Sequence, residues 1–221
     1  MSKKPQSSSI PTPVVSSSPS SSWVEQTTLR HLPATFLGVP VTQVISTFLG
    51  RVPVLLTLLM FQSVSSSILQ HYDDLIQRHT VITLFLTMLV GSGGNAGNQA
   101  TVRILTGLAS KEYSLASAPR VILKESMVGL LLAVSLFVVG ALRVLVFYDD
   151  SDHQETRLAA TVAISVCLFF IVLCSVTVGA LLPFVFLYVG IDPIHAGPSI
   201  QVAMDIIGVI ITCLVCNALL L

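Results

Sequence analysis

Long apolar runs separated by short polar links dominate this chain. A helix needs about 20 predominantly apolar residues to cross the hydrocarbon core of a bilayer. Five runs meet or approach that length, and they cover residues 52–69, 80–108, 126–147, 159–188 and 199–221. The pattern predicts an all-α integral membrane protein with five transmembrane helices.

The second apolar run is interrupted by a polar, glycine-rich sequence. Residues 91–101 read Gly-Ser-Gly-Gly-Asn-Ala-Gly-Asn-Gln-Ala-Thr. Backbone groups freed from a helix at membrane depth must be satisfied by protein or by a water-filled cavity, so such interruptions mark permeation or binding paths. The sequence therefore predicts a glycine-broken second helix in a transport protein. Glycines 93, 94 and 97 are expected to permit backbone conformations or close approaches that a Cβ would obstruct.

Composition agrees with a membrane protein. Hydrophobic residues make up 53% of the chain and charged residues only 10%, whereas soluble domains carry about 25% charged residues. The formal net charge is zero, so nothing indicates a nucleic-acid partner. Membrane lipid is the expected surrounding.

The N-terminal part differs from the rest. Residues 1–22 are rich in Ser and Pro and no acidic residue precedes Glu25, so residues 1–38 are predicted to be disordered. A Ser-rich, acid-poor start also resembles an organellar transit peptide, although the usual Arg enrichment is missing. Apolar positions at 3–4 spacing in residues 39–50 predict a short surface helix. Residues 39–221 thus form the expected transmembrane domain.

Basic residues indicate the orientation. Lys111, Arg120 and Lys124 lie in the link between the second and third runs, and four more basic residues precede the first run. By the positive-inside rule, the N-terminus is cytosolic and the C-terminus lies outside. The pattern does not distinguish the plasma membrane from an organelle membrane.

Asp205 is the most informative charge in the apolar runs. An ionisable group within a span is costly, so it is a functional hypothesis by default. Steps of three or four residues along a helix place Asp205 on one face with small and polar residues. This stripe consists of Pro198, Gln201, Asp205, Gly208 and Thr212. This stripe faces either a water-filled path or another helix. The alternative is close helix packing with Asp205 bonded to a neighbour.

Other polar residues have simpler interpretations. Arg103 is expected to neutralise a carboxylate or to cap freed backbone groups, and both roles stay open. Lys124 and Glu125 resemble ordinary interfacial anchors. Asp192 precedes Pro193 and is expected to shape a turn or helix start. The four cysteines lie in apolar runs and are expected to pack as small hydrophobes.

No enzyme chemistry is visible. The chain has no nucleophile elbow, no H-E-x-x-H and no Walker A motif, so it is predicted not to be an enzyme. Carboxylate and carbonyl oxygens without thiolates or imidazoles suit hard cations such as Mg²⁺, Ca²⁺ or Mn²⁺.

Several motifs in order resemble the MgtE family of magnesium channels and their eukaryotic solute-carrier relatives. Residues 93–109 are similar to that family's second transmembrane segment, and residues 123–132 to the start of its third. Its fourth helix, linker and fifth helix are matched by Leu-Pro-Phe at 182–184, Gly-Ile-Asp-Pro at 190–193, Gly-Pro at 197–198 and Asp-Ile-Ile-Gly at 205–208. The likeness covers about residues 51–221.

The resemblance implies a homodimer whose fifth helices line a pore. The aspartate matching Asp205 would hold hydrated Mg²⁺, with Asn95 and Gln201 as further metal-binding residues. The remaining expected pore-lining residues are Gly93, Gly94, Gly97, Asn98, Gln99, Gly208 and Thr212. MgtE proteins usually carry cytosolic regulatory domains, which the residues before Val52 are too few to encode. The chain resembles the membrane domain alone. The sequence does not show how it would be gated.

The sequence thus predicts a homodimeric channel or transporter for Mg²⁺, with Mn²⁺, Co²⁺ and Ca²⁺ as further candidate ions. Two alternatives remain. One is an exchanger that couples Mg²⁺ to Na⁺ or H⁺, and the other is a non-conducting accessory subunit. The sequence does not separate these three functions.

Overall fold

A computed structural model of the chain describes residues 35–36, 39–147 and 154–220. The predicted disordered segment 1–38 lies outside these residues except for Thr35–Phe36. That strand, β1, pairs antiparallel with β2 (Val39–Pro40). The described chain divides into two compact units, with the boundary between Pro53 and Val54.

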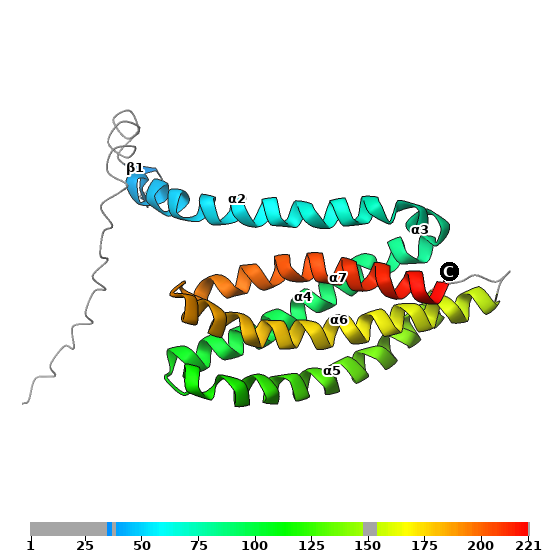
Figure 1. The fold of residues 1–221 in the computed structure, drawn as a ribbon. Helices are drawn as coiled ribbons and strands as arrows, with labels where there is room; N and C mark the ends of the chain where they lie inside the picture. The colour runs from blue at the N-terminus through cyan, green and yellow to red at the C-terminus, as the bar shows by residue number, and fades with distance from the viewer. Residues whose placement is uncertain (1–34, 37–38, 148–153, 221) are drawn as a thin grey trace, which may run out of the picture. The chain divides into compact units, whose positions relative to one another are not determined.

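Helices make up almost all of the described chain (Figure 1). Five helices are long and apolar enough to cross a membrane, so the predicted all-α class and the five spans are confirmed. Short elements connect them: α3 (Asp73–Arg78) and the 3-10 helices η2 (Leu115–Ser117) and η3 (Pro193–His195). The long helices are α2 (Val41–His71), α4 (Thr80–Ala109), α5 (Ala118–Phe147), α6 (Gln154–Val189) and α7 (Ala196–Leu220).

The separate surface helix predicted over residues 39–50 was wrong. Val39–Pro40 form β2, and α2 runs without a break from Val41 to His71, through Gly50 and Pro53. The apolar spacing of residues 41–50 continues into the following span, and a proline is tolerated inside a membrane helix. Neither Gly50 nor Pro53 therefore ends the helix.

The predicted break in the second span was also wrong, because α4 is a continuous helix through residues 91–101. Its glycines serve close packing instead. A Cβ added at Gly93 would lie 2.5 Å from Cγ2 of Ile171 on α6, and one at Gly97 would collide with Ser175. Each glycine costs about 1 kcal/mol of helix propensity relative to alanine, and the close approach of two helices offsets this cost.

The α4–α6 contact has a regular register. Ile171 faces Gly93 and Ser175 faces Gly97. One turn further, the Thr101 hydroxyl donates to the carbonyl of Gly179 at 2.9 Å, across 78 residues of sequence. The Ser175 hydroxyl also donates to the carbonyl of Gly93. Because the contacts on both helices advance together in steps of four, α4 and α6 run parallel, with small residues at their interface.

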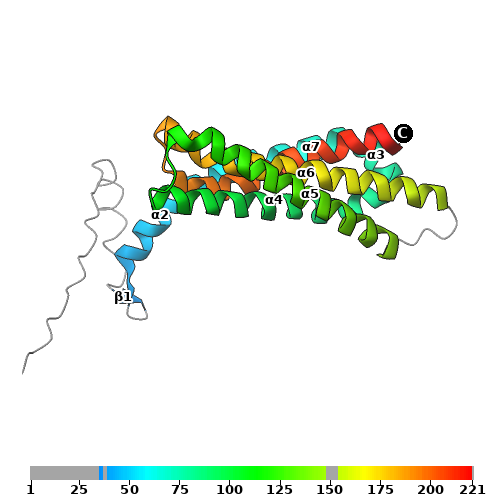
Figure 2. The ribbon, with the colours of Figure 1, turned by 90° about the horizontal axis from the view of Figure 1, so that it is seen from below.

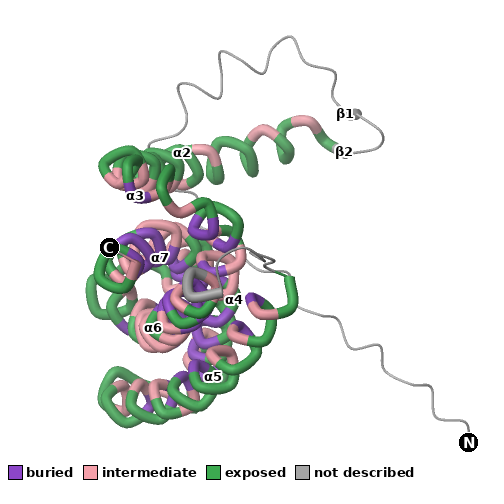
Figure 3. Tube along the Cα trace, turned by 90° about the vertical axis from the view of Figure 1, so that its right-hand side faces the viewer, coloured by how far each residue is buried: buried purple, intermediate pink, exposed green. Residues whose placement is uncertain are grey.

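The other contacts of the bundle are antiparallel. On α7, Gly208 lies against Val90 of α4, whereas Gly197 lies near Asn98. Helices α5 and α6 form a hairpin in which Gly129 faces Val176. Figure 2 shows α4, α5, α6 and α7 side by side, and buried positions gather where they meet (Figure 3). Helix α6 contacts all three of the others, so it is the central helix.

Candidate cation site

Asp205 lies on α7 and is half-buried. Its Oδ1 accepts a hydrogen bond from Nε2 of Gln201, one turn earlier on the same helix, at 3.3 Å. Its Oδ2 accepts a hydrogen bond from Nε2 of Gln62 on α2, at 2.5 Å. A carboxylate has about four lone-pair sites, so acceptor capacity remains. We call Gln62, Gln201 and Asp205 the Asp205 cluster.

Gly94 on α4 makes room for this cluster. A Cβ added at Gly94 would lie 2.5 Å from Nε2 and 2.7 Å from Cδ of Gln201. The i, i+4 spacing places Gln201 and Asp205 on one face of α7. Three helices therefore build the site, because α7 supplies two side chains, α2 supplies the third and α4 supplies a position without a side chain.

A polar surface on α4 adjoins this site. Asn95, Asn98 and Gln99 are exposed, and the amide oxygen of Asn98 would lie 3.8 Å from a Cβ added at Gly197 on α7. We call these three residues the α4 amide face. Because polar side chains that face lipid are unfavourable, this face is expected to contact water or protein.

The remaining predicted pore residues are packed inside the chain. Gly93 and Gly97 face α6, and Gly208 faces Val90 of α4. Thr212 is fully buried, and its hydroxyl donates to the carbonyl of Gly208 at 2.8 Å. The predicted stripe on α7 thus has two different ends. Gly208 and Thr212 are packed inside the chain, whereas Gln201 and Asp205 contact α4 and α2.

Arg103 and Glu125 form an ion pair between α4 and α5. Nε of Arg103 lies 3.1 Å from Oε1 of Glu125, whose side chain is 4% exposed. Of the two roles left open for Arg103, neutralising a carboxylate is therefore the one observed. The interpretation of Glu125 as an interfacial anchor was wrong. A buried carboxylate requires a paired charge, and Arg103 provides it from α4.

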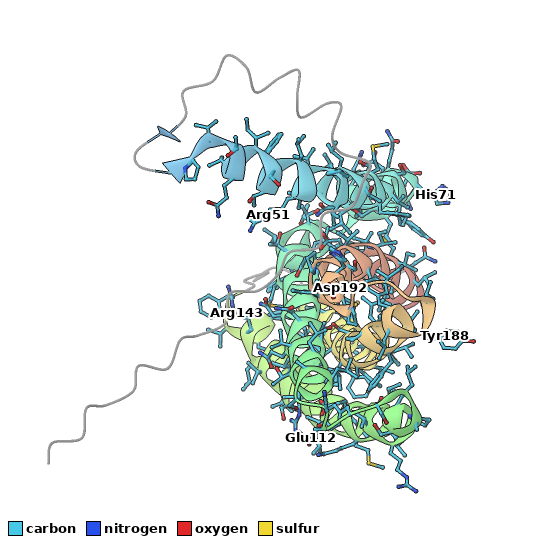
Figure 4. All side chains as sticks on the ribbon, turned by 90° about the vertical axis from the view of Figure 1, so that its left-hand side faces the viewer. Arg51, His71, Glu112, Arg143, Tyr188 and Asp192 are labelled. Atoms are coloured by element: carbon cyan, nitrogen blue, oxygen red, sulfur yellow. The ribbon has the colours of Figure 1, made fainter. Side chains whose placement is uncertain are left out.

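Asp192 is the N-cap residue of η3 in the link between α6 and α7 (Figure 4). Its Oδ1 accepts a hydrogen bond from the backbone N–H of Ile194 at 3.0 Å. The predicted role of Asp192 in shaping a helix start is confirmed. It is therefore a matched control for substitutions at Asp205.

Sequence reasoning missed Gln62 and Ser175. Gln62 is the only amide side chain in the apolar run 52–69, and Ser175 is one of the few hydroxyl residues in the run 159–188. These are the signals that would have found them. The cysteines behave as expected, because all four are free thiols. Three of them are fully buried, and Sγ of Cys167 lies 3.8 Å from Sγ of Cys216.

Among the residues that the structure describes, no three His, Cys, Asp or Glu side chains come together as metal ligands. The oxygens near Asp205 belong to a carboxylate and to amides. Such oxygens suit a hard cation that keeps much of its water shell.

Comparisons with known proteins agree with this chemistry. A family model, MgtE, described as a divalent cation transporter, matches residues 86–215. The magnesium transporter MgtE of Thermus thermophilus is 34% identical over 179 residues, which cover 80% of this chain and 38% of that protein. The Enterococcus faecalis magnesium transporter MgtE is 28% identical over 166 residues, which cover 73% of this chain and 34% of that protein.

This chain therefore spans little more than a third of the length of the curated relatives it matches. The matched region contains the α4 amide face, together with Gln201 and Asp205. The five apolar helices make the chain a multi-pass integral membrane protein. Because the family model matches more than half of its residues, the chain belongs to the MgtE family of divalent cation transporters.

Proposed function

We propose that this chain transports Mg²⁺ across a membrane along a path that passes Asp205. The observation that carries the proposal is the Asp205 cluster itself, a carboxylate within a membrane helix surrounded by amide side chains from α2 and α7. An intramembrane carboxylate costs roughly 2.5 to 3.5 kcal/mol on insertion scales. A passing divalent cation compensates for that cost.

The chemistry favours a hydrated ion. Mg²⁺ dehydrates reluctantly and usually keeps several waters. These waters are hydrogen-bond donors, and the carboxylate of Asp205 and the amide oxygens of Asn95 and Gln201 are acceptors. The site thus binds the ion through its water shell. Mn²⁺, Co²⁺ and Ca²⁺ are further candidate ions, since they also bind oxygen ligands.

We further propose that two copies assemble around this path. The α4 amide face and Gln201 are exposed on helices that are long enough to span a membrane. Lipid would leave their polar groups unsatisfied, whereas a second copy would enclose them with water. A homodimer also brings two Asp205 carboxylates to one ion. In this arrangement the N-terminus is cytosolic and the C-terminus lies outside, as the basic residues indicate.

Uptake of Mg²⁺ into liposomes tests the function. We expect the purified chain to admit Mg²⁺ down its gradient, detected by an enclosed Mg²⁺-sensitive dye, with no opposing gradient of Na⁺ or H⁺. Empty liposomes are the control. Uptake that requires an opposing gradient would identify a coupled exchanger instead. No uptake by correctly folded protein would contradict transport and would favour an accessory subunit.

Crosslinking tests the dimer. After the four native cysteines are replaced, a cysteine introduced at Asn98 should crosslink two copies under mild oxidation, because this residue lies on the exposed amide face. A cysteine at Thr212 is the control, and it should not crosslink because its side chain is fully buried within one chain. A chain that stays monomeric in mild detergent and crosslinks from none of the three amide-face positions would contradict the proposed dimer.

A further inference from the structure

The shortest hydrogen bond to Asp205 comes from a residue outside α4 and α7. Gln62 donates its Nε2 to Oδ2 of Asp205 at 2.5 Å, from a helix 143 residues earlier in the sequence. The bond joins an uncharged donor to a carboxylate, and hydrogen bonds to charged groups are stronger than those between neutral groups. The amide hydrogen therefore occupies one of the lone pairs that a water of a hydrated cation would use.

We propose that Gln62 competes with the transported cation for Oδ2 of Asp205 and thereby weakens cation binding at this site. The inference rests on the proposed function, because it assigns Asp205 to the cation path. The Gln62 amide and a water of the ion's shell cannot use the same lone pair of Oδ2, so the amide must release this oxygen when the ion binds. A contact made only in the empty state raises the apparent dissociation constant of the ligand.

The packing of α2 permits this release. No residue of α2 is buried, and Gln62 itself is exposed. The Gln62 side chain can therefore leave Asp205 without opening a packed core. Gln201 is also exposed, but its amide packs over Gly94 of α4, which limits how it can move away from Asp205. Of the two donors, Gln62 is the one free to exchange with the ion.

Weaker binding of the cation at Asp205 favours its release and therefore its conduction. A conducting site must bind an ion well enough for entry and weakly enough for release. A carboxylate in a membrane span with all its lone pairs available would retain a divalent cation. The Gln62 donor lowers this affinity and allows the cation to leave. Gln62 therefore acts on both the half-saturating Mg²⁺ concentration and the maximal uptake rate, in the same direction.

The test measures both quantities in liposomes. For Gln62→Leu we expect the half-saturating Mg²⁺ concentration to fall about tenfold, since one charge-assisted hydrogen bond is lost only from the empty state. The maximal uptake rate should also fall, because tighter binding slows release. Gln62→Lys places a permanent cation beside Asp205 and should raise the half-saturating concentration. Gln70→Leu makes the same change at another exposed position of α2 and should leave both quantities unchanged.

A merely structural role for Gln62 gives a different result. Partial misfolding lowers the maximal rate without lowering the half-saturating concentration. If Gln62→Leu leaves that concentration unchanged or raises it, competition by Gln62 is refuted.

Equilibrium binding of Mg²⁺ to the protein in detergent provides a second readout that does not depend on flux, and Gln62→Leu should bind more tightly there too. If the wild-type chain binds Mg²⁺ but does not transport it, the proposed function fails. The inference about Gln62 is then decided by whether Gln62→Leu binds Mg²⁺ more tightly than the wild-type chain. If the wild-type chain neither binds nor transports Mg²⁺, both fail.

Discussion

Asp205→Asn is expected to remove most Mg²⁺ uptake while leaving the fold intact. The substitution keeps the shape of the side chain but removes its charge. At about 5 Å and an effective dielectric constant of about 20, the attraction between a unit charge and a divalent ion amounts to several kcal/mol. Uptake at subsaturating Mg²⁺ should therefore fall at least about tenfold, since about 1.4 kcal/mol corresponds to that factor.

Asp205→Asn also changes the hydrogen bonds around this residue. Both carboxylate oxygens accept from amide donors, Gln62 and Gln201. An asparagine replaces one oxygen with an NH₂ group, so one of these donors loses its acceptor. Asp205→Glu keeps the charge but moves it by one methylene, away from both donors and from the water-mediated site. We expect it to lose most uptake as well.

Asp192→Asn is the matched control for these variants. Asp192 lies outside the long helices and caps η3 through the N–H of Ile194, so its substitution should retain much more uptake than Asp205→Asn. The measurement is Mg²⁺ uptake by liposomes that contain equal amounts of each purified variant, with dimer content checked in parallel. Normal uptake by a well-folded Asp205→Asn dimer would show that the ion is bound elsewhere.

The spans could be predicted from the sequence because the bilayer fixes their length. The sequence predicted a second span over residues 80–108, and α4 is Thr80–Ala109. Asp205 could be singled out because a carboxylate within an apolar run has few explanations. Both inferences depend on local composition, which one sequence contains in full.

The glycine-rich segment shows what local composition does not decide. Glycines at membrane depth suit either a broken helix or a close helix contact, because the absence of a Cβ permits both. The choice depends on Ile171, Ser175 and Gly179, which lie on α6 and repeat at the same four-residue interval. Nothing near residues 91–101 in the sequence indicates that these partners face them.

The contact between Gln62 and Asp205 was beyond prediction for a related reason. A single glutamine in an apolar run can lie in a protein interior or at a headgroup, and its partner is 143 residues away. The stripe on α7 predicted that Asp205 faces either water or another helix. It did not indicate which helix this is or which side chain it supplies.

Gly179→Leu is expected to destabilise the protein severely, because this glycine of α6 packs directly against the backbone of α4 at Gly97. A Cβ at Gly179 would lie 2.9 Å from the carbonyl carbon and 3.0 Å from Cα of Gly97. Backbone atoms cannot rotate away as a side chain can. The helices must separate, and the hydrogen bond from Thr101 to the Gly179 carbonyl is then lost. Overpacking costs about 1 to 3 kcal/mol, and we expect the upper end of this range because the clash is with backbone.

The measurement for Gly179→Leu is the midpoint of thermal unfolding in detergent, followed by the loss of the monodisperse peak in size-exclusion chromatography. For a protein of this size, about 3 kcal/mol corresponds to a fall of roughly 6 to 12 °C. Gly91→Leu is the control, because a Cβ at Gly91 meets nothing within 4 Å, and it should unfold close to the wild-type midpoint. If the glycines of α4 instead marked a flexible break, Gly91→Leu would disturb the protein as much as Gly179→Leu. Equal midpoints for the two variants would therefore contradict the packed interface between α4 and α6.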